Sequence, residues 1–204
     1  MKIGSKFKIA RRLGAPIFEK CQTEKFALSL SRKSKTKKTG RRGPLTDFGA
    51  QLIEKQKARL TYGLSERQFS KYVKEVIEKK YQKQDEKLSE ALESRLDNVV
   101  YRLGIAPTRR SGRQFVSHGH LMVNGKKVTI PSYSVKKGEK IAIRDGSKEH
   151  HFAKSIKERY ANWNPPSWLA FNPVAMTGEI KGVPHYEPHE QLFDLKAILE
   201  FYRR

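Results

Sequence analysis

The stretch from Leu92 to Tyr133, LESRLDNVVYRLGIAPTRRSGRQFVSHGHLMVNGKKVTIPSY, decides the fold of this chain. Apolar residues recur along its first third at the spacing of one buried helix face. They are Leu92, Leu96, Val99 or Val100, and Leu103. Gly104 follows where a helix needs a left-handed residue to end, and Pro107 prevents the helix from continuing. The pattern therefore predicts a helix that ends at Gly104.

A second helix and a β-hairpin follow in the same stretch. Thr108 is a favourable N-cap for a helix that runs to about Ser117. Gly112 inside this helix costs about 1 kcal/mol relative to alanine, so we expect a backbone, of protein or of RNA, to approach it closely. Asn124-Gly125 predicts a tight hairpin, because a type I′ turn needs positive φ at both central residues. Alternating residues within 135–144 predict a last strand.

The charge of the chain is large and unevenly placed. The 204 residues include 43 Lys and Arg against 21 Asp and Glu, for a net charge of +22. Residues 1–62 carry +13 and residues 91–148 carry +8, whereas residues 161–204 carry −1. Two basic blocks of this kind indicate a polyanionic partner. No segment approaches 18 apolar residues and the basic blocks lack a wide apolar helix face, so a membrane is not expected as a partner.

Two adjacent segments resemble a known family. The run RLDNVVYRLG…TRRSGRQFVSHGHLMVNGKKVTIPSY is similar to the S-four RNA-binding module. The segment before it, LTDFGAQLIEKQKARLTYGLSERQFSKY (45–72), resembles the helical part of the small-subunit ribosomal protein S-four family of bacteria and organelles. The resemblance implies an α+β fold. A mostly helical domain would hold an inserted module of two angled helices and a small antiparallel sheet.

Four parts are expected along the chain. Residues 1–44 form a basic N-terminal extension, and residues 45–90 form a helical rRNA-binding domain. Residues 91–148 form the RNA-binding module, and by resemblance residues 149–204 pack back on the helical domain. Within the extension, SRKSKTKKTGRR (31–42) has nothing to bury and repels itself, so we expect it to be disordered when free.

The candidate RNA contacts are basic or hydrogen-bonding side chains in the basic blocks. The helix that starts near Thr46 is expected to turn its lysines and arginine outward, and Arg95 and Arg102 share a wet face of the module's first helix. Three arginines begin the second helix, where anions bind favourably. The predicted set is Arg32, Lys33, Lys35, Lys37, Lys38, Arg41, Arg42, Lys55, Lys57, Arg59, Arg67, Arg95, Arg102, Arg109, Arg110, Arg113, His118, His120, Asn124, Lys126 and Tyr133.

The resemblance implies a structural constituent of the small ribosomal subunit. Such a protein binds small-subunit rRNA directly, nucleates assembly of the subunit body and contributes to translational accuracy. It also implies messenger RNA at the entry channel, near Arg41 and Arg42, and the ribosomal protein S-five against the near-neutral tail. DNA is not expected as a partner. The expected location is the ribosome of the cytoplasm, with an organellar ribosome as the open alternative.

The alternative function is an RNA-modifying enzyme that uses the same module, such as a pseudouridine synthase or an RNA methyltransferase. Such an enzyme needs an added catalytic domain. The flanks here are basic or proline-rich and lack a G-x-G-x-x-G loop, so the chain is not expected to be an enzyme. A small heat-shock-type RNA-binding protein is a third possibility, but it would not need segment 45–72.

No metal or cofactor is expected. Some relatives carry a four-cysteine zinc site near the N-terminus, but this chain has only Cys21 there and no histidine before His118. His150-His151, His185 and His189 have no cysteine pair or acidic cluster beside them, so a solvated surface is their expected setting. Cys21 is expected to be a buried or inert thiol in a reducing compartment.

Overall fold

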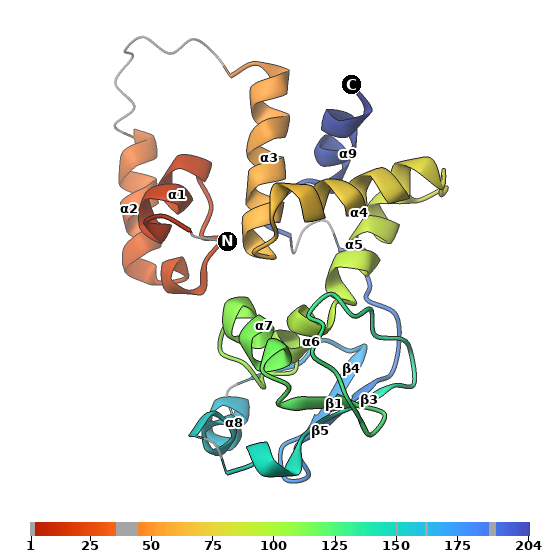
Figure 1. Cartoon of the computed structure of the whole chain (residues 1–204). Helices are drawn as coiled ribbons and strands as arrows, with labels where there is room; N and C mark the ends of the chain where they lie inside the picture. The colour runs from red at the N-terminus through yellow and green to blue at the C-terminus, as the bar shows by residue number, and fades with distance from the viewer. Residues whose placement is uncertain (1–2, 36–44, 150, 162, 188–190) are drawn as a thin grey trace. The chain divides into compact units, whose positions relative to one another are not determined.

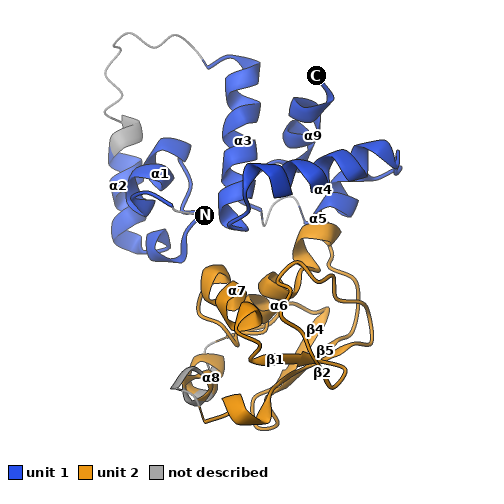
Figure 2. Cartoon of the chain, viewed as in Figure 1, with its two compact units in different colours: residues 1–88, 187–204 blue, residues 89–186 orange. Residues whose placement is uncertain are grey.

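The protein is described by a computed structural model, which covers residues 3–35, 45–149, 151–161, 163–187 and 191–204. The chain divides into two compact units (Figures 1 and 2). Unit 1 comprises Met1–Leu88 and Glu187–Arg204, and unit 2 comprises Ser89–Tyr186. The predicted α+β class is confirmed, since the described helices are accompanied by one five-stranded antiparallel sheet. No described helix has the length and apolar character needed to cross a membrane.

The first part of unit 1 is more ordered than its basic sequence indicates. It contains α1 (Lys6–Leu13), the short 3-10 helix η1 (Glu19–Cys21) and α2 (Glu24–Lys35). α1 ends at Gly14, which has φ of +71°. The helices enclose an apolar cluster to which Leu60 of the next helix contributes. The other buried members are Ala10, Leu13, Ala15, Ile17, Phe18, Cys21 and Phe26. Sequence periodicity missed this core because turns, and not one regular helix face, bring its members together.

The rest of unit 1 consists of α3 (Asp47–Thr61), α4 (Glu66–Glu78), the start of α5 (Gln84–Glu93) and α9 (Leu195–Arg203). α3 and α4 each begin after a residue whose side chain caps the helix. The Thr46 side chain accepts from Gly49 N, and Ser65 forms a capping box with Gln68. α9 lies against α3 and α4 (Figure 1).

The predicted orientation of α3 is wrong. The side chains of Lys55, Lys57 and Arg59 are only 10%, 17% and 17% exposed. Lys55 Nζ lies 2.8 Å from Glu66 Oε1, and Arg59 Nε lies 3.4 Å from Glu66 Oε2. α9 packs against α3, and the cationic side chains meet carboxylates: Lys55 and Arg59 pair with Glu66 of α4, and Lys57 pairs with Glu54. On the same helix the apolar Phe48 is half-exposed beside Phe201.

Unit 2 begins with a break that periodicity did not reveal. The predicted continuous helix through Leu92 and Leu103 is split between α5 and α6 (Leu96–Arg102). Arg95 is extended at this point and bridges Ser134. The next two backbone amides, of Leu96 and Asp97, donate to Tyr133 O and Pro131 O. The later loop thus satisfies donors that a continuous helix would have used internally.

The remaining features of the central stretch match their predictions. α7 (Arg109–Ser117) starts after Thr108, whose side chain accepts from Ser111 N. β1 (Leu121–Val123) pairs with β2 (Lys126–Lys127) through a turn in which Asn124 and Gly125 have φ of 49° and 77°. β3 (Lys140–Ile143) is the predicted last strand, shorter than 135–144. The 3-10 helix η2 (Asp145–Ser147) follows it.

The predicted C-terminal segment 149–204 does not behave as one part. Residues through Tyr186 belong to unit 2, and only the last stretch joins the helical unit. After α8 (His151–Ala161), β4 (Leu169–Asn172) and β5 (Thr177–Ile180) extend the sheet to the order β2-β1-β3-β5-β4. β5 runs close to α6: a Cβ at Gly178 would lie 2.7 Å from Leu103 Cδ1. β5 pairs with the edge of β3. Gly178 makes room for α6 because it has no side chain.

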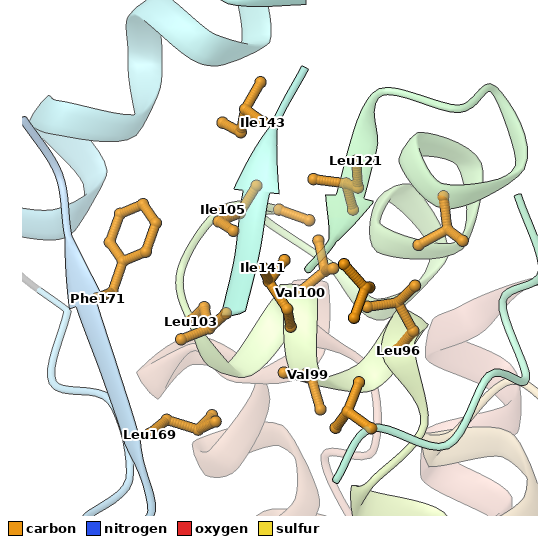
Figure 3. Close-up of a cluster of buried hydrophobic side chains, with 14 of the residues drawn as sticks. Leu96, Val99, Val100, Leu103, Ile105, Leu121, Ile141, Ile143, Leu169 and Phe171 are labelled. Atoms are coloured by element: carbon orange, nitrogen blue, oxygen red, sulfur yellow. The ribbon is translucent and has the colours of Figure 1, made fainter. Parts of the chain in front are cut away.

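The core of unit 2 lies between the sheet and helices α6 and α7. Figure 3 shows Leu96, Val99 and Val100 of α6, and Leu103 at its C-terminal end, in one cluster with strand residues that include Leu169 and Phe171 of β4. Every apolar residue of the predicted helix stripe is fully buried. Burying each such side chain contributes about 1.5–3 kcal/mol, so this core fixes the angle at which α6 and α7 meet.

Candidate nucleic-acid interface

The turn between α6 and α7 is followed by three arginines, Arg109, Arg110 and Arg113, at the start of α7. Thr108 caps α7, so the helix starts at Arg109 and projects three arginines from its first two turns. Arg110 is exposed, whereas Arg109 and Arg113 are partly buried. Gly112 allows α7 to approach α6: a Cβ there would lie 2.6 Å from the carbonyl oxygen of Asp97. The close neighbour predicted for Gly112 is therefore protein backbone.

Asp97 is the acid around which two of the arginines are arranged. It is 3% exposed. Its Oδ1 accepts from Arg95 Nε at 3.1 Å, and its Oδ2 accepts from Arg95 Nη2 at 2.9 Å and from Arg113 Nε at 2.8 Å. The sequence-based expectation that Arg95 lies in water is wrong, because its side chain is 3% exposed. Arg113 is 31% exposed and extends from the same carboxylate toward the surface.

Glu93 and Asn98 organise the other two arginines. Glu93 Oε2 accepts from Arg102 Nε at 2.9 Å, and Oε1 accepts from Arg102 Nη2 at 3.0 Å. Asn98 Nδ2 donates to Glu93 Oε2, and Asn98 Oδ1 accepts from Arg109 Nε at 2.7 Å. The guanidinium carbon of Arg109 lies 4.5 Å from the ring centre of Tyr101, a cation–π distance. Arg102, Arg109 and Arg113 are thus held by hydrogen bonds to buried groups.

Residues from the later part of unit 2 hold the same turn from the other side. Trp163 Nε1 donates to Arg102 O at 2.8 Å, and its ring packs on Gly104 and edge-on to Tyr101. Arg159 Nη1 donates to Gly104 O and Ile105 O. Burial lowers the pKa of Arg159, but a guanidinium pKa is high enough for the group to remain charged.

Of the predicted residues in and around the hairpin, some are exposed and others form hydrogen bonds within the protein. His118 and Lys126 are exposed. His120 Nδ1 lies 3.0 Å from Ser147 Oγ, and Asn124 Oδ1 accepts from Lys140 N at 2.9 Å. Tyr133 Oη donates to Glu139 Oε1 at 2.7 Å, and this hydrogen bond raises the pKa of the tyrosine. Asn124 and Tyr133 therefore shape the loops, and the exposed cations are the more accessible groups.

The predicted residues of unit 1 that the structure describes are spread over three helices, α2, α3 and α4. Arg67 is exposed on α4, and the exposed Lys71 and Lys74 follow it at helical spacing. Lys55 and Arg59 face Glu66 instead. Arg32 is exposed on α2, which also includes Lys33 and Lys35. Lys37, Lys38, Arg41 and Arg42 lie outside the described residues.

Several residues of the candidate interface were not predicted. Lys127, which follows the predicted Lys126, is exposed in β2 and its stem lies over Gly119. A lysine pair in a hairpin strand is a signal that could have found it. Glu93, Asn98 and Trp163 have no such signal, because nothing in their spacing shows that a helix break and a distant loop bring them to the arginines.

Possible metal ligands are not clustered in the described part of the chain. No group of three or more His, Cys, Asp or Glu residues that could hold a metal ion occurs among the described residues. Cys21 is a free, buried thiol. Burial raises its pKa, with the charges of Lys6 and Arg11 acting in the opposite direction. A protonated, buried thiol is a weak nucleophile and a weak ligand.

Sequence comparisons fit the arrangement of two helices and a sheet flanked by a helical unit. The model of the S4 domain matches residues 94–141, and the model of the ribosomal protein S4/S9 N-terminal domain matches residues 1–93. The fold and the arginine-rich turn thus define a protein with an S4 domain that follows a ribosomal protein S4/S9 N-terminal domain.

Full-length relatives give the family itself. The chain is 43% identical over 207 residues to the small ribosomal subunit protein uS4 of Roseiflexus castenholzii, with 99% of this chain and 98% of the relative covered. It is 38% identical to the protein of the same name from Halothermothrix orenii, with 97% and 96% covered. The uS4 protein of Acetivibrio thermocellus is 39% identical, with 98% of each chain covered. The chain belongs to the family of the small ribosomal subunit protein uS4.

Proposed function

We propose that this protein is a structural constituent of the small ribosomal subunit that binds small-subunit rRNA directly. The observation that carries the proposal is the arginine cluster at the α6–α7 turn. Arg102, Arg109 and Arg113 are tied to buried groups there, beside the exposed Arg110, in a chain of net charge +22. Such a surface suits a folded polyanion, and family membership supports rRNA as that polyanion.

Recognition would rest on phosphates and on the shape of the RNA. Guanidinium groups at the start of α7 can each donate two hydrogen bonds to a phosphate, and the helix N-terminus favours negative charge. RNA helices offer few base edges to a protein side chain, so contacts across grooves read backbone geometry. The exposed Lys126, Lys127 and His118 of the same unit would widen the contact.

An enzymatic role has no support from the family, which is named for a subunit of the ribosome. The finer roles extend the same proposal. The chain would nucleate assembly of the subunit body, contribute to translational accuracy and act in a cytoplasmic ribosome. The S-five protein would contact the near-neutral C-terminal part, whose residues 161–204 carry a charge of −1.

A role at the messenger RNA entry channel would involve Arg41 and Arg42. Changing both to Ala should leave rRNA binding within about tenfold, because the remaining cations supply most of the electrostatic free energy. Ribosomes that carry this variant should slow more on a message with a stable hairpin than on an unstructured message. Equal slowing on both messages would indicate a general assembly defect.

Crosslinking and sequencing of the bound RNA tests the main proposal. Crosslinks from unit 2 should concentrate at one helix junction of small-subunit rRNA when the tagged protein is expressed in cells. Crosslinks spread evenly over messenger, transfer and ribosomal RNA would contradict a structural role at one rRNA site.

A further inference from the structure

Three polar residues are buried beneath the arginine cluster. Glu93, Asp97 and Asn98 are 4%, 3% and 2% exposed, and they lie where α5 ends and α6 begins. A buried carboxylate destabilises a fold unless it is paired and hydrogen-bonded. Both acids meet that requirement through arginines, so their cost is offset within unit 2.

The buried polar residues have more arginine partners than folding requires. Asp97 already has a two-point partner in Arg95, which is itself buried, yet it also binds Arg113. Four guanidinium groups, those of Arg95, Arg102, Arg109 and Arg113, converge on two carboxylates and one amide. A purely structural set of ion pairs would be closer to neutral. The excess positive charge lies on partly exposed side chains, since Arg102 and Arg113 are each 31% exposed.

The hydrogen bonds fix the orientation of each guanidinium group. Arg102 is held through Nε and Nη2, and Arg113 is also held through Nε and Nη2. Arg109 is held through Nε and by the Tyr101 ring. An arginine side chain that moves freely on the protein surface loses conformational entropy when it binds a phosphate. These three have already lost much of that freedom in the folded protein.

We propose that Glu93 and Asp97 are positioning residues that select folded RNA over unstructured RNA. Glu93 holds Arg102 directly and Arg109 through Asn98, and Asp97 holds Arg113, so that the three arginines keep one fixed pattern. The inference rests on the proposed function. A rigid pattern of cations matches phosphates that a folded RNA holds at fixed separations. A flexible strand adapts to any cationic surface, so it gains little from the fixed pattern. The acids would therefore raise affinity for folded RNA although they carry negative charge.

The expected direction of the change in affinity, when one of these acids is neutralised, determines the experiment. Glu93→Gln removes one negative charge, so net electrostatics alone predict tighter binding to every RNA. The matched control is Asp145→Asn, which removes one charge from an 86% exposed carboxylate paired with Lys148. Full-length variants are titrated with a folded fragment of small-subunit rRNA and with polyuridylate of equal length. Thermal unfolding is followed in parallel.

We expect Glu93→Gln to weaken binding to the folded fragment by roughly tenfold, the size of one lost charge-assisted contact. Its binding to polyuridylate should stay equal or become tighter. Asp145→Asn should leave the ratio of the two affinities unchanged. If Glu93→Gln tightens or weakens both RNAs equally, the positioning role is overturned. If the unmodified protein shows no preference for the folded fragment, the proposed function itself fails, which is a separate outcome.

A second variant decides the matter if Glu93→Gln does not fold. Arg102→Lys keeps the charge and leaves Glu93 a cationic partner, but a lysine cannot form the two-point contact. It should reduce the preference for folded RNA while affinity for polyuridylate is retained. An unchanged preference in this variant overturns the proposal. Where both variants fold, the double variant should lose no more preference than the larger single loss, because the two residues act as one unit.

Discussion

Arg109, Arg110 and Arg113 differ in what each does for the fold. Arg110 is exposed, whereas Arg109 and Arg113 also bind Asn98 and Asp97. Replacing all three by Ala should weaken rRNA binding by several kcal/mol, at about 1–3 for each charge-assisted contact. The sequence alone suggests that folding would change little, but the buried partners predict a lower melting temperature as well.

Arg110→Ala alone separates binding from stability. It should weaken rRNA binding by about 1–3 kcal/mol, and its unfolding free energy should stay within about 0.5 kcal/mol of the unmodified protein. Filter binding and thermal unfolding measure the two quantities. If the variant with Arg109, Arg110 and Arg113 all replaced by Ala bound rRNA normally, the RNA-binding face would lie elsewhere in unit 2, at His118, His120, Lys126 and Tyr133.

Glu66 gives unit 1 a pH-dependent link between helices. Burial raises the pKa of this carboxyl, but hydrogen bonds from Lys55 and Tyr202 and the charges of Lys55 and Arg59 outweigh burial, so the pKa is lowered. Burial and the same hydrogen bond raise the pKa of Tyr202 far above its ordinary value. A carboxyl with a lowered pKa stabilises the fold above its unfolded pKa, about 4.3, and this stabilisation is lost as pH falls through the folded pKa.

Glu66→Gln should therefore lower the melting temperature at pH 7 and lose its effect in acid. The carboxylate is half-exposed, so the difference should not exceed about 1 kcal/mol. Melting curves between pH 7 and pH 3 measure it. Glu75→Gln is the control, because its partner Lys79 is the C-cap residue of the same helix, so this half-exposed ion pair is local to α4. A difference that persists undiminished at pH 3 would contradict the role of the charge.

At the scale of elements, α9 is the clearest test of the near-neutral C-terminal part. Leu195, Ile198 and Leu199 are buried, and Gln51 Nε2 of α3 donates to Glu200 Oε2. Deleting residues 190–204 removes three large apolar contacts, each worth about 1.5–3 kcal/mol. The deletion should destabilise unit 1 or alter misreading more than it alters affinity for naked rRNA. Loss of RNA affinity with stability and accuracy intact would reject this assignment.

The elements that the sequence predicted well are those whose signals are local. Thr108, Gly104 and Asn124-Gly125 each determine their own backbone, and the structure confirms the cap, the helix end and the turn. The break at Arg95 was missed because the loop near Tyr133, far along the chain, provides the competing hydrogen bonds. β4 and β5 were missed for a similar reason, since β5 is a strand by virtue of pairing with β3, and β4 by virtue of pairing with β5.

The residues of the candidate site likewise divide into those that the sequence predicts and those that depend on the fold. Charge patterning identified Arg109, Arg110 and Arg113 as a group at the start of the second helix, and it paired Arg102 with Arg95 on the first. It could not show which arginines are buried, since Arg95 and Arg102 look equivalent on a helical wheel. It also gave no role to Glu93, because an acid inside a basic block has no visible partner until the fold is known.

At the scale of the whole molecule, the net charge should dominate the response of binding to salt. If about ten phosphates are neutralised, the logarithm of the binding constant should fall against the logarithm of salt concentration with a slope of roughly −7 to −9. Titrations of an rRNA fragment at several potassium chloride concentrations measure the slope. Binding that barely changes between low and moderate salt would contradict an electrostatic interface.

Unit 1 is built from both ends of the chain, and unit 2 lies between them in sequence (Figure 2). During synthesis, all of residues 89–186 emerge before α9 exists. Unit 2 can then fold as a unit while α3 and α4 still lack the helix that covers them. A nascent chain paused in this state would expose apolar surface on α3 and α4, so we expect chaperones to bind unit 1 until the last helix has been made.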